Sequence, residues 1–153
     1  MQTFLPYADF QQIADCLDRK RLGAMLREPQ QTLDTLYMNP TRKGTPRKGY
    51  VNHPVLNLWR GYEDALRLYI NTMRLKWIEI GYNSKVPLFV LPSNIEMPPW
   101  IGNEDFHSRH RSQLYYKLPS HYAQFDWPEA SLPIKDYIWN PKDYLKEMQC
   151  SSQ

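Results

Sequence analysis

The sequence predicts an all-α fold: a compact single-domain helical protein with a long central helix and irregular, proline-rich connections. Several segments repeat apolar residues at the three-and-four spacing of one helix face. No segment alternates apolar and polar residues in the way of a half-buried strand. Thirteen prolines and only six glycines are typical of helices separated by rigid loops. The length of 153 residues suits one domain, residues 1–153, around one core.

The composition favours a soluble intracellular protein. Hydrophobic residues make up 42% of the chain, which is enough to form a core. Cys16 and Cys150 lie near opposite ends, so a disulfide framework is not indicated and a reducing compartment is favoured. The sequence has no apolar run that could span a membrane, and its N-terminus lacks the basic-then-apolar order of a signal peptide. We therefore expect a cytoplasmic location and no membrane partner.

An apolar arm precedes the first predicted helix. Phe4, Leu5 and Tyr7 should hold this arm on the core, although chain termini usually fray. Asp9 followed by Gln12 fits a capping box, which predicts a helix that begins near residue 10. The N-terminus is therefore expected at a defined place in the fold.

Residues 18–36 have helical periodicity and contain Glu28 directly before Pro29. A proline inside a helix removes one backbone hydrogen bond and clashes with the preceding turn, so we expect a kink there. Four basic residues lie in the first half of the segment: Arg19, Lys20, Arg21 and Arg27. Glu28 is then either an ordinary solvated glutamate or a functional carboxylate in a basic environment.

Residues 39–54 have the composition of a loop. They include three prolines, two glycines and four basic residues, and no acidic residue occurs from Thr35 to Tyr62. The loop is either a solvated flexible segment or a surface for phosphates, because clustered Lys and Arg neutralise a nucleic-acid backbone and release counterions.

Residues 55–81 carry the widest apolar stripe, and Gly81 is well placed to end a helix there. A single helix of about 27 residues would span ~40 Å and form the structural spine. The proline-rich residues 82–101 should then lie across the helices as a strap. Another helix is expected over residues 104–118, ended by Pro119, followed by an aromatic and proline-rich wrap. Residues 142–153 are expected to be a short helix or a frayed tail.

Two classes of site are disfavoured. His107 and His110 have the i, i+3 spacing of shared metal ligands, and His53 or His121 could add a third, but zinc sites more often show HExxH or paired CxxC. Cys16 lies on an apolar helix face, and no serine has a nucleophile-elbow context. We expect no metal, no cofactor and no serine or cysteine nucleophile.

Two features favour chemistry on nucleic acid. Basic residues alternate with aromatic ones in RHRSQLYYK, residues 109–117, a mixture that contacts phosphates and stacks on bases. An anchored α-amine is also a capable nucleophile, because α-amines in general have an unperturbed pKa of about 7.7–8.0, against about 10.4 for lysine, and so have a sizeable neutral fraction near pH 7. A neutral amine can attack C1′ of a sugar and form a Schiff base, and a carboxylate such as Glu28 could stabilise the cationic sugar.

Three stretches resemble the pyrimidine dimer DNA glycosylase family, the endonuclease V type that also cleaves abasic sites. RLGAMLRE, residues 21–28, is similar to that family's helix with the catalytic glutamate. NHPVLNLWRGYEDAL and its continuation to IGYN, residues 52–83, are similar to its long central helix. FHSRHRSQLYYKLPSHY, residues 106–122, is similar to its late helix with an L-x-x-K element. The resemblance is to a longer branch that begins MQTFLPY and shares FH-x-x-H.

The resemblance implies a compact all-helical domain, attack by the N-terminal α-amine, base release through a Schiff base and β-elimination of the strand. It assigns Glu28 to the catalytic carboxylate, Arg27 to the arginine before it and Lys117 to the DNA-contacting lysine. Well-studied members lose Met and expose threonine, whereas the bulk of Gln2 should retain Met1 here. Gln2 could cyclise if Met1 were lost. Gln31 stands where the family has an arginine.

We therefore expect a monomeric DNA glycosylase with abasic-site lyase activity, acting on double-stranded DNA that carries a pyrimidine dimer or another damaged base. Met1 and Glu28 are the expected catalytic residues. The expected DNA contacts are Arg21, Arg27, Gln31, Arg42, Lys43, Arg47, Lys48 and Lys117. The expected pocket lining is Gln2, Asn52, His53, His107, His110 and Arg111. The alternative is a non-catalytic DNA-binding module that keeps the fold.

Overall fold

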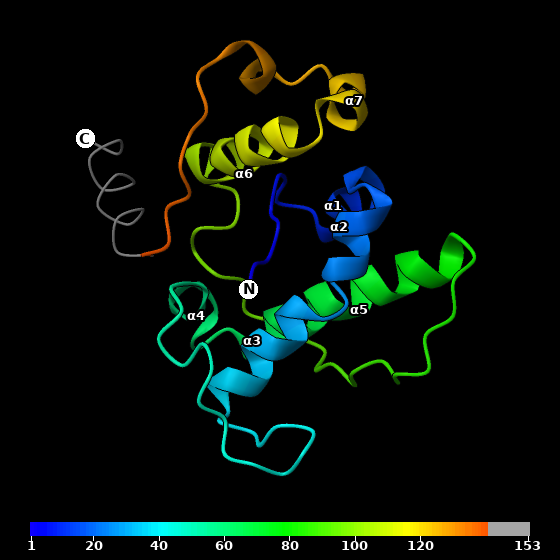
Figure 1. Cartoon of the computed structure of the whole chain (residues 1–153), viewed down its shortest axis with the longest axis vertical. Coiled ribbons are helices and arrows are strands. Elements are labelled where there is room, and N and C mark those ends of the chain that lie inside the picture. The colour runs from blue at the N-terminus through cyan, green and yellow to red at the C-terminus, as the bar shows by residue number, and fades with distance from the viewer. Residues whose placement is uncertain (141–153) are drawn as a thin grey trace.

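The computed structural model describes residues 1–140, and within them it contains helices and irregular segments but no strand, which confirms the all-α prediction. Two groups of helices lie on either side of the N-terminal arm, residues 1–9 (Figure 1). In the first group, α5 (Glu63–Glu79) contacts the other four helices: α1 (Phe10–Cys16), α2 (Arg19–Ala24), α3 (Glu28–Leu36) and α4 (Val55–Trp59). The second group consists of α6 (Glu104–Lys117), α7 (Pro119–Tyr122) and two 3-10 turns, η1 (Ala123–Phe125) and η2 (Pro128–Ser131).

One hydrophobic core joins the two groups. Leu5 of the arm and Trp59 of α4 are fully buried in it, as are Tyr69 of α5 and Phe106 of α6. The arm is therefore held on the core, as its apolar residues predicted. No helix in residues 1–140 has both the length and the apolar character needed to cross a membrane.

Side-chain caps set where three of the helices begin. Asp9 accepts a hydrogen bond from the backbone N–H of Gln12 at the start of α1, as predicted. Asp18 does the same for Arg21 at the start of α2, and Asn103 for Phe106 at the start of α6. Each oxygen satisfies one of the backbone donors that have no partner within the helix.

The segment 18–36 is two helices rather than one kinked helix. α2 ends at Ala24, Met25–Arg27 form a turn, and α3 begins at Glu28 with Pro29 in its first turn. Proline has no N–H and its ring would clash with the carbonyl of Met25, but both features are harmless at the start of a helix. The predicted kink was therefore wrong in form, because the proline begins a new helix. Glu28 consequently lies at a helix N-terminus.

The predicted long helix over residues 55–81 is also two helices, α4 and α5. Gly61 separates them with a φ of +91°, which favours glycine strongly, and the side chain of Glu63 accepts from its N–H. α5 has 17 residues, so the spine is shorter than expected. Its end agrees with the prediction: Gly81 has a φ of +105° and donates to the Ile78 carbonyl, while Tyr82 donates to the Trp77 carbonyl, which together form a Schellman motif.

Two irregular segments cover the helices, as expected. The strap of residues 82–101 is held by Asn71 of α5, whose amide exchanges two hydrogen bonds with the backbone of Phe89. Residues 132–140 run along α6 and are held there by Ser112, which accepts from the Lys135 N–H, and by Gln113, which donates to the Lys135 carbonyl. The predicted short helix or frayed tail at residues 142–153 lies outside the described residues.

Candidate active site

The structure brings the chain terminus and the carboxylate of α3 together. The Met1 amine nitrogen lies 3.5 Å from Oε1 of Glu28, and the Glu28 side chain is 26% exposed. The Met1 side chain is fully buried, whereas the residue as a whole is half-buried, so its accessible surface belongs to main-chain atoms. An amine and a carboxylate thus meet at a place that a ligand can reach.

The first group of helices fixes the arm by hydrogen bonds to two successive residues. Nε1 of Trp59 in α4 donates to the Thr3 hydroxyl over 2.9 Å, and the Tyr69 hydroxyl in α5 donates to the Phe4 carbonyl over 2.7 Å. Thr3 is fully buried. These bonds hold the side chain of Thr3 and the backbone of Phe4, close to the amine in the chain.

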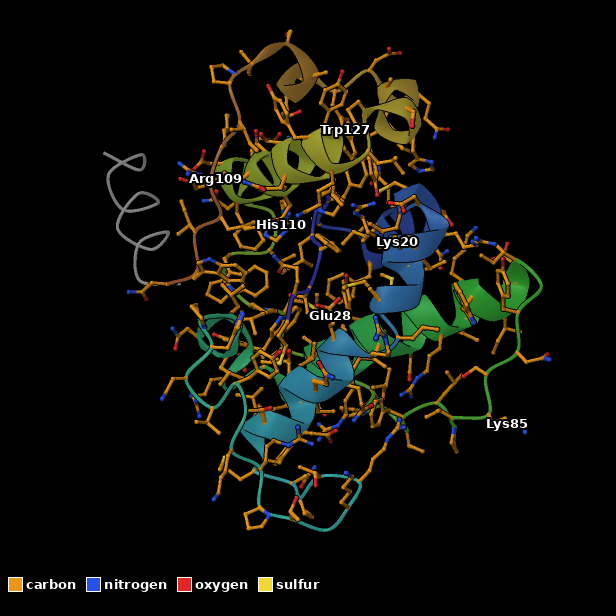
Figure 2. All side chains as sticks on the ribbon, viewed as in Figure 1. Lys20, Glu28, Lys85, Arg109, His110 and Trp127 are labelled. Atoms are coloured by element: carbon orange, nitrogen blue, oxygen red, sulfur yellow. The ribbon has the colours of Figure 1, made fainter. Side chains whose placement is uncertain are left out.

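The second group fixes the next two residues of the arm through α6. His110 accepts from the Leu5 N–H at Nδ1 over 3.1 Å, and Nδ1 of His107 bonds to the Leu5 carbonyl over 2.8 Å. Arg111 donates to the Pro6 carbonyl over 2.8 Å. Figure 2 shows the arm passing between the helix of His110 and the helix that begins at Glu28. α6 therefore acts as a clamp on the backbone that carries the amine.

This clamp corrects the expectation that His107, His110 and Arg111 line an open pocket. They are only 2%, 1% and 7% exposed, and each places one polar atom against the backbone of the arm. The i, i+3 spacing of the two histidines did indicate a shared partner, but the partner is the backbone of Leu5 and not a metal. Within residues 1–140, no group of three or more His, Cys, Asp or Glu side chains is arranged to hold a metal ion.

Both clamp histidines need to be neutral. Nε2 of His107 accepts from the Gly102 N–H, so its proton is on Nδ1 and points to the Leu5 carbonyl. His110 accepts at Nδ1, so a proton there would break the bond from Leu5. Burial lowers the pKa of His110 well below its ordinary value, and the charge of His107 lowers it further. Burial also lowers the pKa of His107.

Arg111 lies between two glutamates, the buried Glu129 and the exposed Glu104. It contacts Glu129 at 2.9 Å and also pairs with Glu104, while Ser108 donates to Glu129 over 2.8 Å. Burial lowers the pKa of Arg111, but the hydrogen bonds and charges of the two glutamates raise it above its ordinary value. The positive charge of Arg111 is therefore balanced by two carboxylates of the protein itself.

The charges of the Met1 amine and of the Glu28 carboxylate both affect the pKa of His53. Burial lowers its pKa, the positive charge of the Met1 amine lowers it further, and the Glu28 carboxylate raises it. Its Nδ1 accepts from the Val55 N–H, and its ring contacts Trp139 at 5.8 Å. Of the other expected pocket residues, Gln2 is half-buried and accepts from the Thr3 N–H, and Asn52 is exposed in the turn before α4.

The residues that were expected to contact DNA differ in their exposure and in whether they pair with a carboxylate. Arg27 is exposed in the turn before α3, Gln31 is exposed on α3, and Lys43 and Lys48 are exposed on the loop. Arg21 is paired with Asp18 at 3.2 Å, and Arg47 with Asp34 at 3.9 Å. Lys117 is exposed at the end of α6, in the second group of helices. Cys16, expected in the core, is 2% exposed, and burial raises the pKa of its thiol to about 12.

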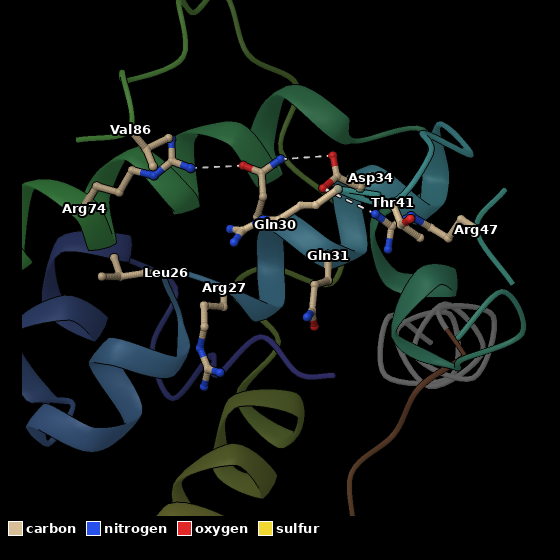
Figure 3. Close-up of a pocket in the computed structure, with 10 residues that line it drawn as sticks. Leu26, Arg27, Gln30, Gln31, Asp34, Thr41, Arg47, Arg74 and Val86 are labelled. Carbon is tan, nitrogen blue, oxygen red and sulfur yellow. Dashed lines mark hydrogen bonds and ion pairs between the residues drawn. The ribbon is translucent and has the colours of Figure 1, made fainter. Parts of the chain in front are cut away.

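A pocket of about 520 Å³ opens beside the first turn of α3 (Figure 3). Its polar lining includes Arg27, Gln31, Arg42 and Arg47, which the sequence had assigned to DNA. It also includes Arg74 of α5, which sequence reasoning missed. The available signal was an arginine on the apolar stripe of a helix, four residues after Ile70 and three before Trp77.

A protein family with the description pyrimidine dimer DNA glycosylase matches the chain over residues 1–89, which is more than half of its 153 residues. This region contains the arm, α1 to α5, the basic loop and both partners of the amine–carboxylate pair. No curated protein and no solved structure matches the chain.

Proposed function

Because this chain belongs to the pyrimidine dimer DNA glycosylase family, we propose that it removes a pyrimidine dimer or another damaged or modified base from double-stranded DNA and then cleaves the strand as an abasic-site lyase. The family supports a DNA glycosylase of this general type. The finer proposal depends on one observation, the 3.5 Å between the Met1 amine and Oε1 of Glu28.

In the proposed reaction the neutral Met1 amine attacks C1′ of the damaged nucleotide. The bond from C1′ to the base breaks, and the base leaves with the electron pair and takes up a proton. Loss of the amine proton and opening of the sugar ring give an imine between the Met1 nitrogen and C1′. Removal of a C2′ proton then breaks the C3′–O bond and leaves a 5′-phosphate on the downstream strand. Water finally hydrolyses the imine and restores the amine.

Glu28 has two roles in this scheme. Its carboxylate stabilises the positive charge that develops on the sugar, and it assists the transfer of protons to and from the reacting atoms. Its position supports both, since the charge develops on atoms bonded to the amine that it faces. The clamp from α6 and the bonds from Trp59 and Tyr69 position the amine for attack.

The buried Met1 side chain supports Met1 as the residue that supplies the amine. It is fully buried and packs against the core, so its removal would leave a void beside Glu28. The target nucleotide has to leave the base stack, or the duplex has to bend, before an amine at the protein surface can reach C1′. Exposed basic residues in the turn before α3 and on the loop, Arg27, Arg42, Lys43 and Lys48, support phosphate contacts.

The test is chemical trapping of the imine. The protein is incubated with duplexes that contain an abasic site or a pyrimidine dimer, in the presence of borohydride, and a covalent protein–DNA adduct is expected. The same protein with its α-amine acetylated should give no adduct. An adduct of undiminished yield after acetylation would assign the nucleophile to a lysine. The absence of an adduct on every substrate would favour the alternative, a DNA-binding module without catalysis.

A further inference from the structure

The pocket beside α3 contains more positive charge than the protein balances. Its lining has four arginines, Arg27, Arg42, Arg47 and Arg74, and one acidic residue, Asp34, which gives a formal net charge of +3. Asp34 is already engaged: it pairs with Arg47 at 3.9 Å and accepts from Gln30 and Asn39 over 3.2 Å each. The remaining charge is therefore open to an anion from outside the protein.

Arg74 is the most unusual of the four. It is only 3% exposed, yet no carboxylate in residues 1–140 lies within ion-pair distance of its guanidinium. It donates to the Pro87 carbonyl over 3.0 Å and to Oε1 of Gln30 over 3.0 Å. Burial lowers its pKa. A buried charge without a counter-charge is costly, so its retention in the wall of a pocket points to a charged ligand.

A second arginine of α5, Arg67, does have a carboxylate partner, so the lack of one at Arg74 is not a general property of this helix. Arg67 lies two turns earlier and, like Arg74, has its guanidinium near the ring of Phe89, at 5.9 Å against 5.2 Å. Arg67, however, pairs with Asp64 at 2.8 Å. Burial lowers the pKa of Arg67, but Tyr37 and Asp64 raise it above its ordinary value. Arg67 is therefore a matched reference for an arginine that needs no ligand.

The arrangement of the wall is set before a ligand enters. Figure 3 shows a row of side chains from Arg74 through Gln30 and Asp34 to Arg47, while Arg27 and Gln31 extend away from that row. The Gln30 amide gives its oxygen to Arg74 and its NH2 group to Asp34, so it is fixed in one orientation. Leu26 and Val86 add apolar surface. The volume of about 520 Å³ exceeds what a phosphate group alone would fill, and it lies within the usual range for small-molecule sites.

We propose that this pocket binds the terminal 5′-phosphate of a DNA strand, with Arg74 and Arg42 as its principal contacts. A phosphate monoester carries a charge of about −1.5 to −2 near pH 7 and has three acceptor oxygens, and so matches several guanidiniums better than a singly charged internal phosphodiester does. The inference rests on the proposed function, since β-elimination creates such an end on the downstream strand. The pocket would then retain one product of the reaction.

Binding to nicked duplexes tests the proposal. Two duplexes of identical sequence carry a 5′-phosphate or a 5′-hydroxyl at the nick, and fluorescence anisotropy gives the dissociation constant of each. The phosphorylated duplex should bind about tenfold or more tightly, the effect of one additional charge-assisted hydrogen bond. Arg74→Met and Arg42→Gln should each reduce this preference, and Arg67→Gln should retain it. Arg42 is exposed on the loop, so its variant remains informative if Arg74→Met does not fold.

A second measurement does not depend on DNA binding or on catalysis. Thymidine 5′-monophosphate or, as a control without a phosphate, thymidine is titrated into the ¹⁵N-labelled protein, and the Nε–H signal of Arg74 is followed by NMR. A saturable shift with the nucleotide is expected, and it should be absent with thymidine. Equal binding of the two nicked duplexes, or a preference that Arg74→Met and Arg42→Gln both retain, would overturn the proposal. Imine trapping would be unaffected by that result, so the two proposals can fail separately.

Discussion

Arg111 of α6 and Arg74 of α5 are both buried, at 7% and 3% exposure, but they belong to two regions that treat positive charge differently. Arg111 has Glu129 at 2.9 Å and Glu104 as a further partner, and it donates to the backbone of the arm. Arg74 has a carbonyl and an amide oxygen as partners, and it lines a pocket with three more arginines.

The difference separates a region whose buried arginine is balanced by carboxylates from a region whose arginines line a pocket without enough carboxylates to balance them. On the α6 side, His107, His110 and Arg111 are buried and each bonds to the backbone of the arm, so this side can hold the arm that carries the amine. On the α3 side, the amine, the Glu28 carboxylate and the pocket arginines face solvent or a cavity. Substitutions on the two sides should therefore affect different observables, stability for α6 and activity or binding for α3.

The largest expected effect is on catalysis, on the α3 side. Glu28→Gln keeps the shape of the side chain but removes its charge, so strand cleavage should fall by about 10²- to 10⁴-fold while DNA binding is kept. Cleavage of an abasic-site duplex and anisotropy with the same duplex measure the two quantities. Glu79→Gln, an exposed carboxylate at the end of α5, is the control and should cleave normally. Equal cleavage by the Glu28 variant would remove the role proposed for this residue.

The next effect is on stability, on the α6 side. Arg111→Met leaves Glu129, which is 2% exposed, as a buried charge without its partner, so the free energy of unfolding should fall by about 3–5 kcal/mol. Urea denaturation measures it. Arg109→Met on the same helix breaks a partly exposed i, i+4 pair with Asp105 and an exposed hydrogen bond to the Asp136 carbonyl, which predicts a smaller loss of about 1 kcal/mol. If Arg74→Met were as destabilising as Arg111→Met, the distinction between the two arginines would be lost.

The third effect is a pH dependence from the clamp. The pKa of His110 is lowered in the folded protein, so below the unfolded value of about 6.5 the unfolded chain binds more protons and stability falls with falling pH. For each histidine whose pKa is lowered on folding, the free energy of unfolding falls by about 1.4 kcal/mol per pH unit between its unfolded and its folded pKa. Urea denaturation at pH 7, 6 and 5 should show this loss, and His110→Gln should have a shallower slope. An unchanged slope in the variant would show that His110 is not the group that titrates.

The smallest expected effect is electrostatic and concerns Arg27, which is exposed beside Glu28. If it contacts one phosphate, Arg27→Gln should weaken binding to all duplexes alike and reduce the slope of log K against log salt by about 1. Anisotropy titrations at several salt concentrations measure that slope. Arg67→Gln, which removes an arginine paired with Asp64, should leave it unchanged. A slope that Arg27→Gln does not alter would place Arg27 outside the DNA interface.

The sequence by itself determined the elements that depend on local chemistry. The cap at Asp9, the helix ended by Pro119 and the termination at Gly81 follow from bonds and backbone angles within a few residues, and the structure confirms all three. The family of the chain, and the role proposed for Glu28, came from motifs in a particular order. The two helix breaks, at Met25–Arg27 and at Gly61, were missed because the apolar periodicity continues across both, as the helices on either side face the same core.

Only the tertiary structure determined which residues that are distant in the sequence are neighbours in space. Met1 and Glu28 are distant in sequence, and the 3.5 Å between them depends on bonds to the arm from α4, α5 and α6. The same holds for His107, His110 and Arg111, whose hydrogen bonds to the arm no helical pattern indicates, and for Arg74, which shares a pocket with a loop about thirty residues earlier in the chain. The physical reason is that burial and charge compensation depend on which groups the fold brings together, and a sequence lists those groups without their distances.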